Sequence, residues 1–152
     1  MDIQITDISL PERSASNILS FPESNAMPAR VPCEETQRFN CWGFTAYYYQ
    51  WEERAFWMTA EQMKTYLKVR TNPISKEEVR AGDIAVFSYP DWMKDGLAHT
   101  AVILPSGKMV YHKPGGCELC IDTLESAMVS YGRNVTYVRA IGSETKISEK
   151  TI

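Results

Sequence analysis

The sequence lacks clustered positive charge and long apolar runs. Its 152 residues carry 16 lysines and arginines against 19 aspartates and glutamates, a net charge of −3, and the basic residues form no cluster. This excludes the basic patch that nucleic-acid-binding proteins present. No uncharged apolar run is long enough to cross a bilayer, so we expect no membrane span.

The amino terminus lacks the pattern of a secretory signal peptide. Residues 1–10 include Asp2 and Asp7, and they show no basic stretch followed by an apolar one. We therefore expect synthesis in the cytoplasm. Any extracellular substrate would have to be reached by a different delivery route.

The chain length predicts one domain with two flanking segments. Prolines 11, 22, 28 and 32 interrupt residues 1–38, which predicts an extended N-terminal arm. Residues 39–142 hold the regular patterns and form the predicted domain. Residues 143–152, rich in Ser, Glu, Lys and Thr, are expected to form a flexible tail.

The chain has four cysteines, and only the Cys117-Glu118-Leu119-Cys120 run has a recognisable spacing. Without a secretion signal, free thiols are expected rather than a disulfide framework. A structural zinc site needs four ligands, and His112 is the one further ligand close by in sequence. A redox role would require the pair to open a helix in a βαβ unit. We expect incidental thiols, with no metal and no cofactor.

The order of elements predicts an α+β fold in which helices pack on one antiparallel sheet. Helices are predicted at residues 41–54, 59–69 and 122–131, the second with a Thr59/Gln62 capping box. Strands are predicted at 84–87, 98–104, 108–113 and 135–141, with 98–113 forming a hairpin. The aromatic residues of the first helix are expected to lie in the core.

Cys41 begins the first predicted helix. Unpaired N–H groups and the macrodipole at a helix N-terminus favour negative charge, so we expect its thiol to ionise near neutral pH. A thiolate is a nucleophile that needs a base, and the backbone N–H of Cys41 is a natural oxyanion donor. Thiol reactivity above that of a model cysteine is expected, falling when the base is replaced.

The chain's two histidines, His99 and His112, lie on the same predicted hairpin. A two-residue loop at 105–106 places them opposite one another, and one at 106–107 makes them diagonal neighbours on the same face. A three-residue loop places them on opposite faces. In the first two registers His99 can act as the base for Cys41, and His112 can orient its ring. A small buried thiol with structural histidines is the simpler alternative, but it leaves the shared hairpin and the helix-start cysteine unexplained.

Four stretches, in order, resemble the motifs of NlpC-type papain-like cysteine peptidases. Residues 39–44 (Phe-Asn-Cys-Trp-Gly-Phe) resemble the family's Asp-Cys-Ser-Gly-Phe element, and residues 80–87 (Arg-Ala-Gly-Asp-Ile-Ala-Val-Phe) its Pro-Gly-Asp-Leu strand. Residues 99–103 (His-Thr-Ala-Val-Ile) resemble its His-Val-Gly-Ile strand, and residues 108–116 its Met-Ile-His-Ala strand. CHAP amidases have a similar Cys-then-His order, and the strand with His112 favours the NlpC type.

The resemblance implies a papain-like fold with Cys41 as nucleophile, His99 as base and His112 as the third polar residue. It implies peptidoglycan stem peptides as substrate, often cleaved between D-glutamate and a diamino acid. Asn40 and Trp42 replace the usual aspartate and serine, and the tyrosine often found upstream is absent, which leaves Gln37 as a substitute oxyanion donor. No wall-binding module accompanies the domain, so a phage-borne or otherwise delivered enzyme is expected.

Two alternatives stay open. A papain-like hydrolase of another isopeptide, thioester or lipid ester bond would keep the same three residues. A catalytically retired protein that binds or assembles with a partner would account for Asn40, Trp42 and the proline-rich arm. The sequence identifies no immunity or assembly partner.

Overall fold

The structure is a computed structural model, which describes residues 29–31, 38–89, 96–105, 107–114 and 118–142. The predicted tail and almost all of the predicted arm lie outside these residues. The helices are α3 (Cys41–Tyr48), α4 (Ala60–Arg70), α5 (Leu124–Tyr131) and the short 3₁₀ helix η2 (Lys76–Glu78). The strands are β1 (Ala29–Val31), β2 (Thr71–Ile74), β3 (Ile84–Ser88), β4 (Leu97–Ile103), β5 (Met109–His112), β6 (Leu119–Thr123) and β7 (Val135–Ala140).

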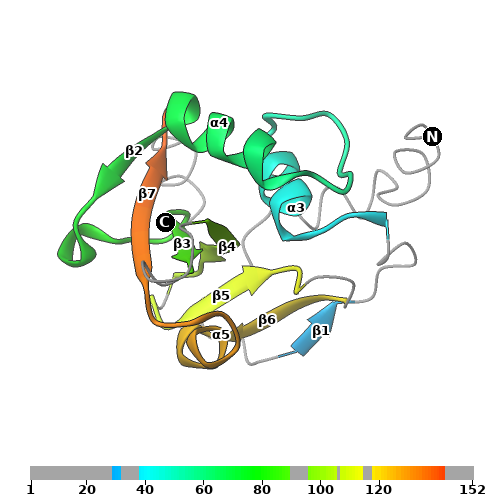
Figure 1. Cartoon of the computed structure of the whole chain (residues 1–152). Coiled ribbons are helices and arrows are strands. Elements are labelled where there is room, and N and C mark those ends of the chain that lie inside the picture. The colour runs from blue at the N-terminus through cyan, green and yellow to red at the C-terminus, as the bar shows by residue number, and fades with distance from the viewer. Residues whose placement is uncertain (1–28, 32–37, 90–95, 106, 115–117, 143–152) are drawn as a thin grey trace.

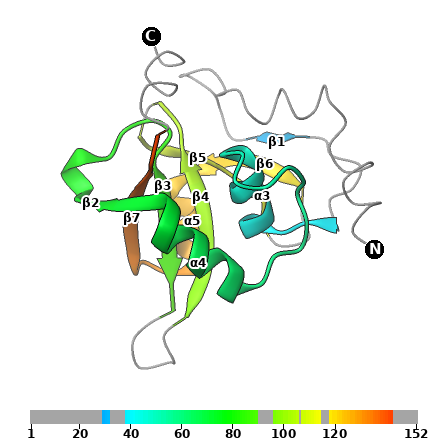
Figure 2. The same cartoon turned by 90° about the horizontal axis from the view of Figure 1, so that it is seen from above.

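All seven strands form one antiparallel sheet, in the order β1-β6-β5-β4-β3-β7-β2. Helices α3 and α4 cover one face of the sheet and α5 covers the other (Figures 1 and 2). The predicted α+β class is confirmed. Among the described helices, none combines the length and apolar character that a membrane crossing requires.

The side chains of strand β3 alternate between the two faces of the sheet. Ile84 and Val86 pack in the cluster that contains Met63 of α4. Ala85 and Phe87 point the other way, into the cluster that contains Ala127 of α5. A strand buried on both faces reads as a continuous apolar run, which is why 84–87 was predictable.

Helix α3 ends earlier than predicted, at Tyr48 rather than near residue 54. Gln50 adopts a left-handed φ of 63°, and the N–H of Trp51 donates to the carbonyl of Ala46 at 2.9 Å, which closes the last turn. Phe44 and Tyr48 are buried, as expected of core aromatics. Trp51, beyond the helix, stacks on Tyr49 and on Tyr66 of α4 instead.

The predicted helix boundaries elsewhere follow from their caps. Thr59 and Gln62 form both halves of the capping box that begins α4. Thr123 caps α5 by accepting from the N–H of Ser126 at 2.9 Å. Gly132, with φ of 102°, ends α5, because few residues other than glycine adopt this backbone conformation.

Strands β1, β2 and β6 were not predicted. Pro73 lies inside β2 and removes a backbone donor there, but β2 is the edge of the sheet, where a proline is tolerated. Strand β6 lies beside β5, so it extends the sheet next to the histidine hairpin.

Candidate active site

Asn40 fixes the start of helix α3 and therefore the position of Cys41, the first helical residue. Its Oδ1 accepts from the N–H of Gly43 at 3.0 Å and from the N–H of Met58 at 3.1 Å. Its Nδ2 donates to the carbonyl of Met58 at 2.9 Å. An aspartate could not make this last bond, so the Asn40 amide joins the helix to the 55–58 segment through one hydrogen bond more than an aspartate would.

The Cys41 thiol lies in a buried ring of backbone N–H groups. Cys41 is only 6% exposed. The N–H groups of Thr100, Trp42 and Cys41 itself bond to the sulfur and favour the thiolate, as does the nearby charge of Lys113.

Burial outweighs these groups, and it raises the pKa of Cys41 to about 12. The expectation that this thiol ionises near neutral pH was therefore wrong for the resting protein. The helix N-terminus supplies the favourable N–H groups, but desolvation of the sulfur is the larger effect.

His99 and His112 form a hydrogen-bonded pair. Strands β4 and β5 pair Val102 with Tyr111 and Ile103 with Val110, the register of a loop at 106–107. In that register the two histidines are diagonal neighbours on one face of the sheet. Nε2 of His99 lies 2.7 Å from Nδ1 of His112, and both residues are buried.

The other ring nitrogen of His99, Nδ1, is buried and has no hydrogen-bond partner among the described residues. The ring stacks on Tyr131 of α5, with centroids 3.8 Å apart and planes at 3°. Burial, and then the charge of His112, hold the pKa of His99 well below its ordinary value. The ring is therefore neutral, with one nitrogen committed to His112 and the other available.

Strand β4 passes next to Cys41. One of the three N–H groups that bond to the sulfur belongs to Thr100, the residue after His99 in β4. The hydroxyls of Thr100 and of Thr45 in α3 lie 2.8 Å apart, which holds the helix against the strand. The sulfur of Cys41 therefore lies beside the residue that follows His99 in β4, while the His99 ring itself packs on Tyr131 of α5.

Two residues near the site were not singled out from the sequence. Lys113 is fully buried, and its Nζ donates to the carbonyl of Phe39 at 2.7 Å and lies 4.6 Å from the centre of the Phe39 ring. Asp122 Oδ2 lies 3.7 Å from Nε2 of His112. Asp122 would have been found had β6 been recognised, because its alternation places Asp122 on the face of His112. The candidate oxyanion residue Gln37 lies outside the described residues.

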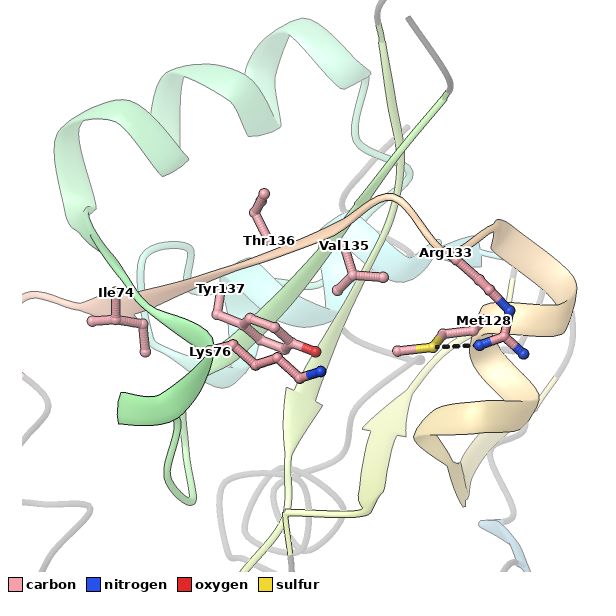
Figure 3. Close-up of a pocket in the computed structure, with 7 residues that line it drawn as sticks. All are labelled: Ile74, Lys76, Met128, Arg133, Val135, Thr136 and Tyr137. Atoms are coloured by element: carbon pink, nitrogen blue, oxygen red, sulfur yellow. Dashed lines mark hydrogen bonds between the residues drawn. The ribbon is translucent and has the colours of Figure 1, made fainter.

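A hollow between β2, α5 and β7 is a separate feature (Figure 3). Seven residues line it, including Lys76, Arg133 and Tyr137. None of these seven is a cysteine or a histidine. Arg133 there is ion-paired with Glu125. This hollow therefore lacks a cysteine nucleophile and a histidine base, and it is not the candidate active site.

A comparison with protein family models identifies the family of this chain. The NlpC/P60 family model matches residues 30–139, which include Cys41, His99 and His112. The chain belongs to the NlpC/P60 family. No curated protein and no solved structure gave a significant match. NlpC/P60 proteins are cysteine peptidases and amidases that act on peptidoglycan-type substrates.

The protonation states of this NlpC/P60 protein make its thiol chemistry testable. Because the pKa of Cys41 is about 12, the reactive thiolate is a minor form whose fraction grows with pH. We predict that alkylation of Cys41 by iodoacetamide accelerates roughly tenfold per pH unit between about pH 6 and pH 9. Quantifying the alkylated Cys41 peptide by mass spectrometry separates it from the other three thiols. A rate independent of pH across this range would instead indicate a resting thiolate–imidazolium pair.

Proposed function

We propose that this NlpC/P60 protein is a cysteine peptidase or amidase that cleaves a peptide bond in peptidoglycan stem peptides. Cys41 is the nucleophile, His99 the base and His112 the residue that orients it. The observation that carries the proposal is the 2.7 Å bond between His99 Nε2 and His112 Nδ1, together with the Nδ1 of His99, for which the described part of the chain offers no hydrogen-bond partner. A buried polar atom without a partner calls for an explanation, and service as the proton acceptor of the reaction is one.

In the first half-reaction, His99 Nδ1 accepts the Cys41 proton as the sulfur attacks the carbonyl carbon. Since both groups are neutral at rest, proton transfer and attack occur together. The protonated His99 then gives its proton to the leaving amine, which leaves an acyl group on Cys41. In the second half-reaction His99 removes a proton from water, which attacks the thioester carbonyl, and His99 returns that proton to the departing sulfur, which restores the Cys41 thiol and releases the carboxylic acid product.

The N–H groups that bond to the sulfur also suit the oxyanion of the tetrahedral intermediate. Those of Cys41 and Trp42 lie at the start of α3, where the helix leaves its first donors unpaired. These N–H groups form the oxyanion hole that we expected from the backbone of Cys41. Gln37 is not required for it.

His112 sets the tautomer of His99. If its Nδ1 accepts from His99 Nε2–H, the lone pair of His99 is left on Nδ1, where the thiol proton must go. His112 then carries its own proton on Nε2, facing the carboxylate of Asp122 at 3.7 Å. The negative charge of Asp122 favours that arrangement.

The test is digestion of purified sacculi and of their soluble peptide fragments by the full chain, with products identified by mass. We expect cleavage of one stem-peptide bond by the wild type and none by Cys41→Ala. Equal cleavage by both proteins would exclude Cys41 as nucleophile. No cleavage by either would contradict the proposed substrate and favour an ester or thioester hydrolase, or a retired domain that only binds.

A further inference from the structure

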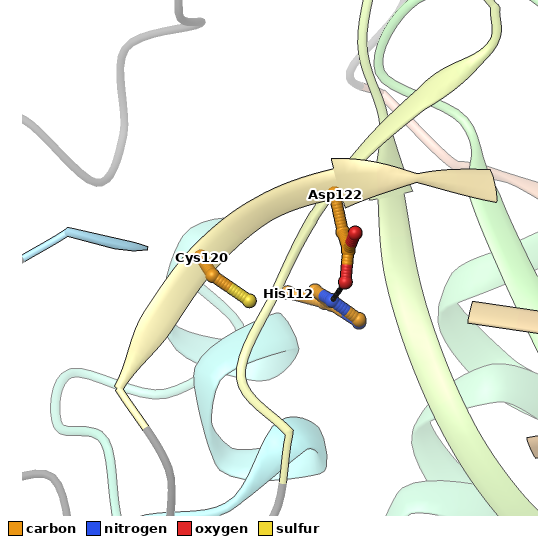
Figure 4. A group of neighbouring side chains, drawn as sticks. All are labelled: His112, Cys120 and Asp122. Carbon is orange, nitrogen blue, oxygen red and sulfur yellow. Dashed lines mark ion pairs between the residues drawn. The ribbon is translucent and has the colours of Figure 1, made fainter. Parts of the chain in front are cut away.

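Next to the histidine pair, three potential metal ligands lie close together, on the Nε2 side of the His112 ring. They are His112 of β5 and Cys120 and Asp122 of β6 (Figure 4). His112 pairs directly with Cys120 across the two strands, and Asp122 follows two residues later on the same face. Their ligand atoms all lie within 4.8 Å of one another.

We propose that His112 Nε2, Cys120 Sγ and the Asp122 carboxylate bind one Zn²⁺ ion, and that this ion switches the hydrolase off. The metal is a regulator here rather than a cofactor of the reaction. The binding site stands on its own geometry, and only the switching rests on the proposed function.

The spacing of the atoms fits shared coordination better than a hydrogen bond. His112 Nε2 and Asp122 Oδ2 are 3.7 Å apart, beyond hydrogen-bond range. In a tetrahedral zinc site, ligand atoms lie about 3.3–3.6 Å apart, because each is about 2.0–2.3 Å from the ion. Small side-chain rotations would therefore bring this set to zinc geometry.

The chemistry of the set and its access also fit zinc. One imidazole, one thiolate and one carboxylate are all common zinc ligands, and water completes the tetrahedron at sites with three protein ligands. The His112 side chain is 2% exposed, while that of Asp122 is 33% exposed, which gives the ion an entry from solvent. On binding, the Cys120 thiol releases its proton to water.

The hydrogen bond to His99 converts metal binding into inhibition. Zinc on Nε2 of His112 takes that lone pair, so the ring's proton must lie on Nδ1. Nδ1–H then donates to His99 Nε2, which reverses the 2.7 Å bond. His99 must carry its own proton on Nδ1, the position that should accept the proton of Cys41. The pair keeps the same number of protons, but the base is blocked.

The proposal departs from the sequence analysis, which expected incidental thiols and no metal, and its ligand set differs from the zinc set weighed there. The Cys117-x-x-Cys120 spacing pointed to paired thiols, whereas Asp122 takes the third place beside His112 and Cys120. Cys117 lies outside the described residues and has no part in the proposed site. It therefore provides a control.

Binding is tested on the full chain, stripped of metal with a chelator, without any hydrolysis assay. We expect one equivalent of Zn²⁺ by competition with a chromophoric chelator, and a thiolate-to-cobalt absorption band with Co²⁺. Cys120→Ser should abolish that band, and Asp122→Asn should weaken Zn²⁺ binding at least about tenfold. Cys117→Ser and Cys41→Ala should bind like the wild type.

The control variants separate the rival sites. Loss of binding in Cys117→Ser would indicate a site built on the paired cysteines, and loss in Cys41→Ala would place the ion on the nucleophile. Either result, or wild-type binding that survives both Cys120→Ser and Asp122→Asn, would overturn the proposed site. So would the absence of stoichiometric binding to the wild type.

The switch is tested separately, with stem-peptide hydrolysis as the readout. We expect Zn²⁺ at saturating concentration to reduce the wild-type rate at least about tenfold, and a chelator to restore it. Cys120→Ser should need at least about tenfold more Zn²⁺ for the same inhibition. If zinc binds at this site without slowing hydrolysis by the wild type, the proposed switch is refuted, but the proposed binding site is retained. If the protein shows no hydrolysis at all, the proposed function fails, and the binding result is unaffected.

Discussion

Replacing His99 by glutamine is expected to reduce kcat for stem-peptide cleavage by about 10³-fold, within the range that general bases contribute. Glutamine keeps a hydrogen-bonding group near His112 but has no nitrogen lone pair to accept the thiol proton. KM should change little, because the proposed role of His99 is in bond cleavage rather than in substrate binding. Steady-state kinetics on a soluble stem peptide would measure both quantities.

The matched variant is His112→Gln, which removes the orienting residue and leaves the base. We expect a smaller loss, about 10–100-fold, since an unrestrained His99 still visits the productive tautomer and orientation. Both residues are buried, so the thermal midpoints of the variants must first be shown to lie well above the assay temperature. His99→Gln retaining more than a tenth of the wild-type kcat would remove His99 from its assigned role.

Gly43→Ala is expected to destabilise the fold by at least about 3 kcal/mol, the upper part of the range for overpacking. A methyl group at Gly43 would collide with the backbone carbonyl of Phe56, and its nearest neighbours are all backbone atoms of that residue. Backbone held by the Asn40–Met58 bonds cannot move aside as a flexible side chain would. Chemical denaturation of both proteins gives the free energy of unfolding.

This prediction opposes helix propensity, which favours alanine over glycine by about 1 kcal/mol inside a helix. The control is Gly107→Ala, where no atom lies within 4 Å of the added methyl but φ is +78°. There we expect a loss of about 1 kcal/mol from backbone strain alone. A stabilised Gly43→Ala would show that the helix and the 55–58 segment are not in close contact.

The parts of the fold that could be predicted are those with local causes. The Thr59/Gln62 capping box begins α4, and Gly132 ends α5, because each acts within one helical turn. The close approach at Gly43 has a local signal too, since a glycine early in a helix suggests contact with another backbone. Its partner, Phe56, became apparent only in the structure.

The closeness of His99 and His112 was predicted from the loop lengths possible for the hairpin, and the strand register was left open. The sequence could not choose between loops, because each of the two favourable ones puts His99 and His112 on the same face. The observed pairing of Val102 with Tyr111 selects the diagonal arrangement. Strand β6 was not predicted, nor was the placement of Cys120 and Asp122, because the strand is short and its last two residues, 122 and 123, match a helix-capping pattern.

The ionisation of Cys41 could not be read from the sequence. A helix start argues for a lowered pKa, and the N–H groups that do lower it are present. The opposing effect is desolvation, which depends on how deeply α3 is packed against β4 and the 55–58 segment. Burial of this kind is a property of the tertiary structure.

The central claim, that Cys41 carries the substrate as an acyl-enzyme, is tested most directly by acid quenching. The full chain would be mixed with excess soluble stem peptide, quenched within the first turnover and digested, and each cysteine peptide examined by mass spectrometry. We predict an added acyl group of the expected mass on the peptide that contains Cys41, and none on the peptide that contains Cys120. Cleavage that proceeds at full rate after complete alkylation of Cys41 would contradict the account.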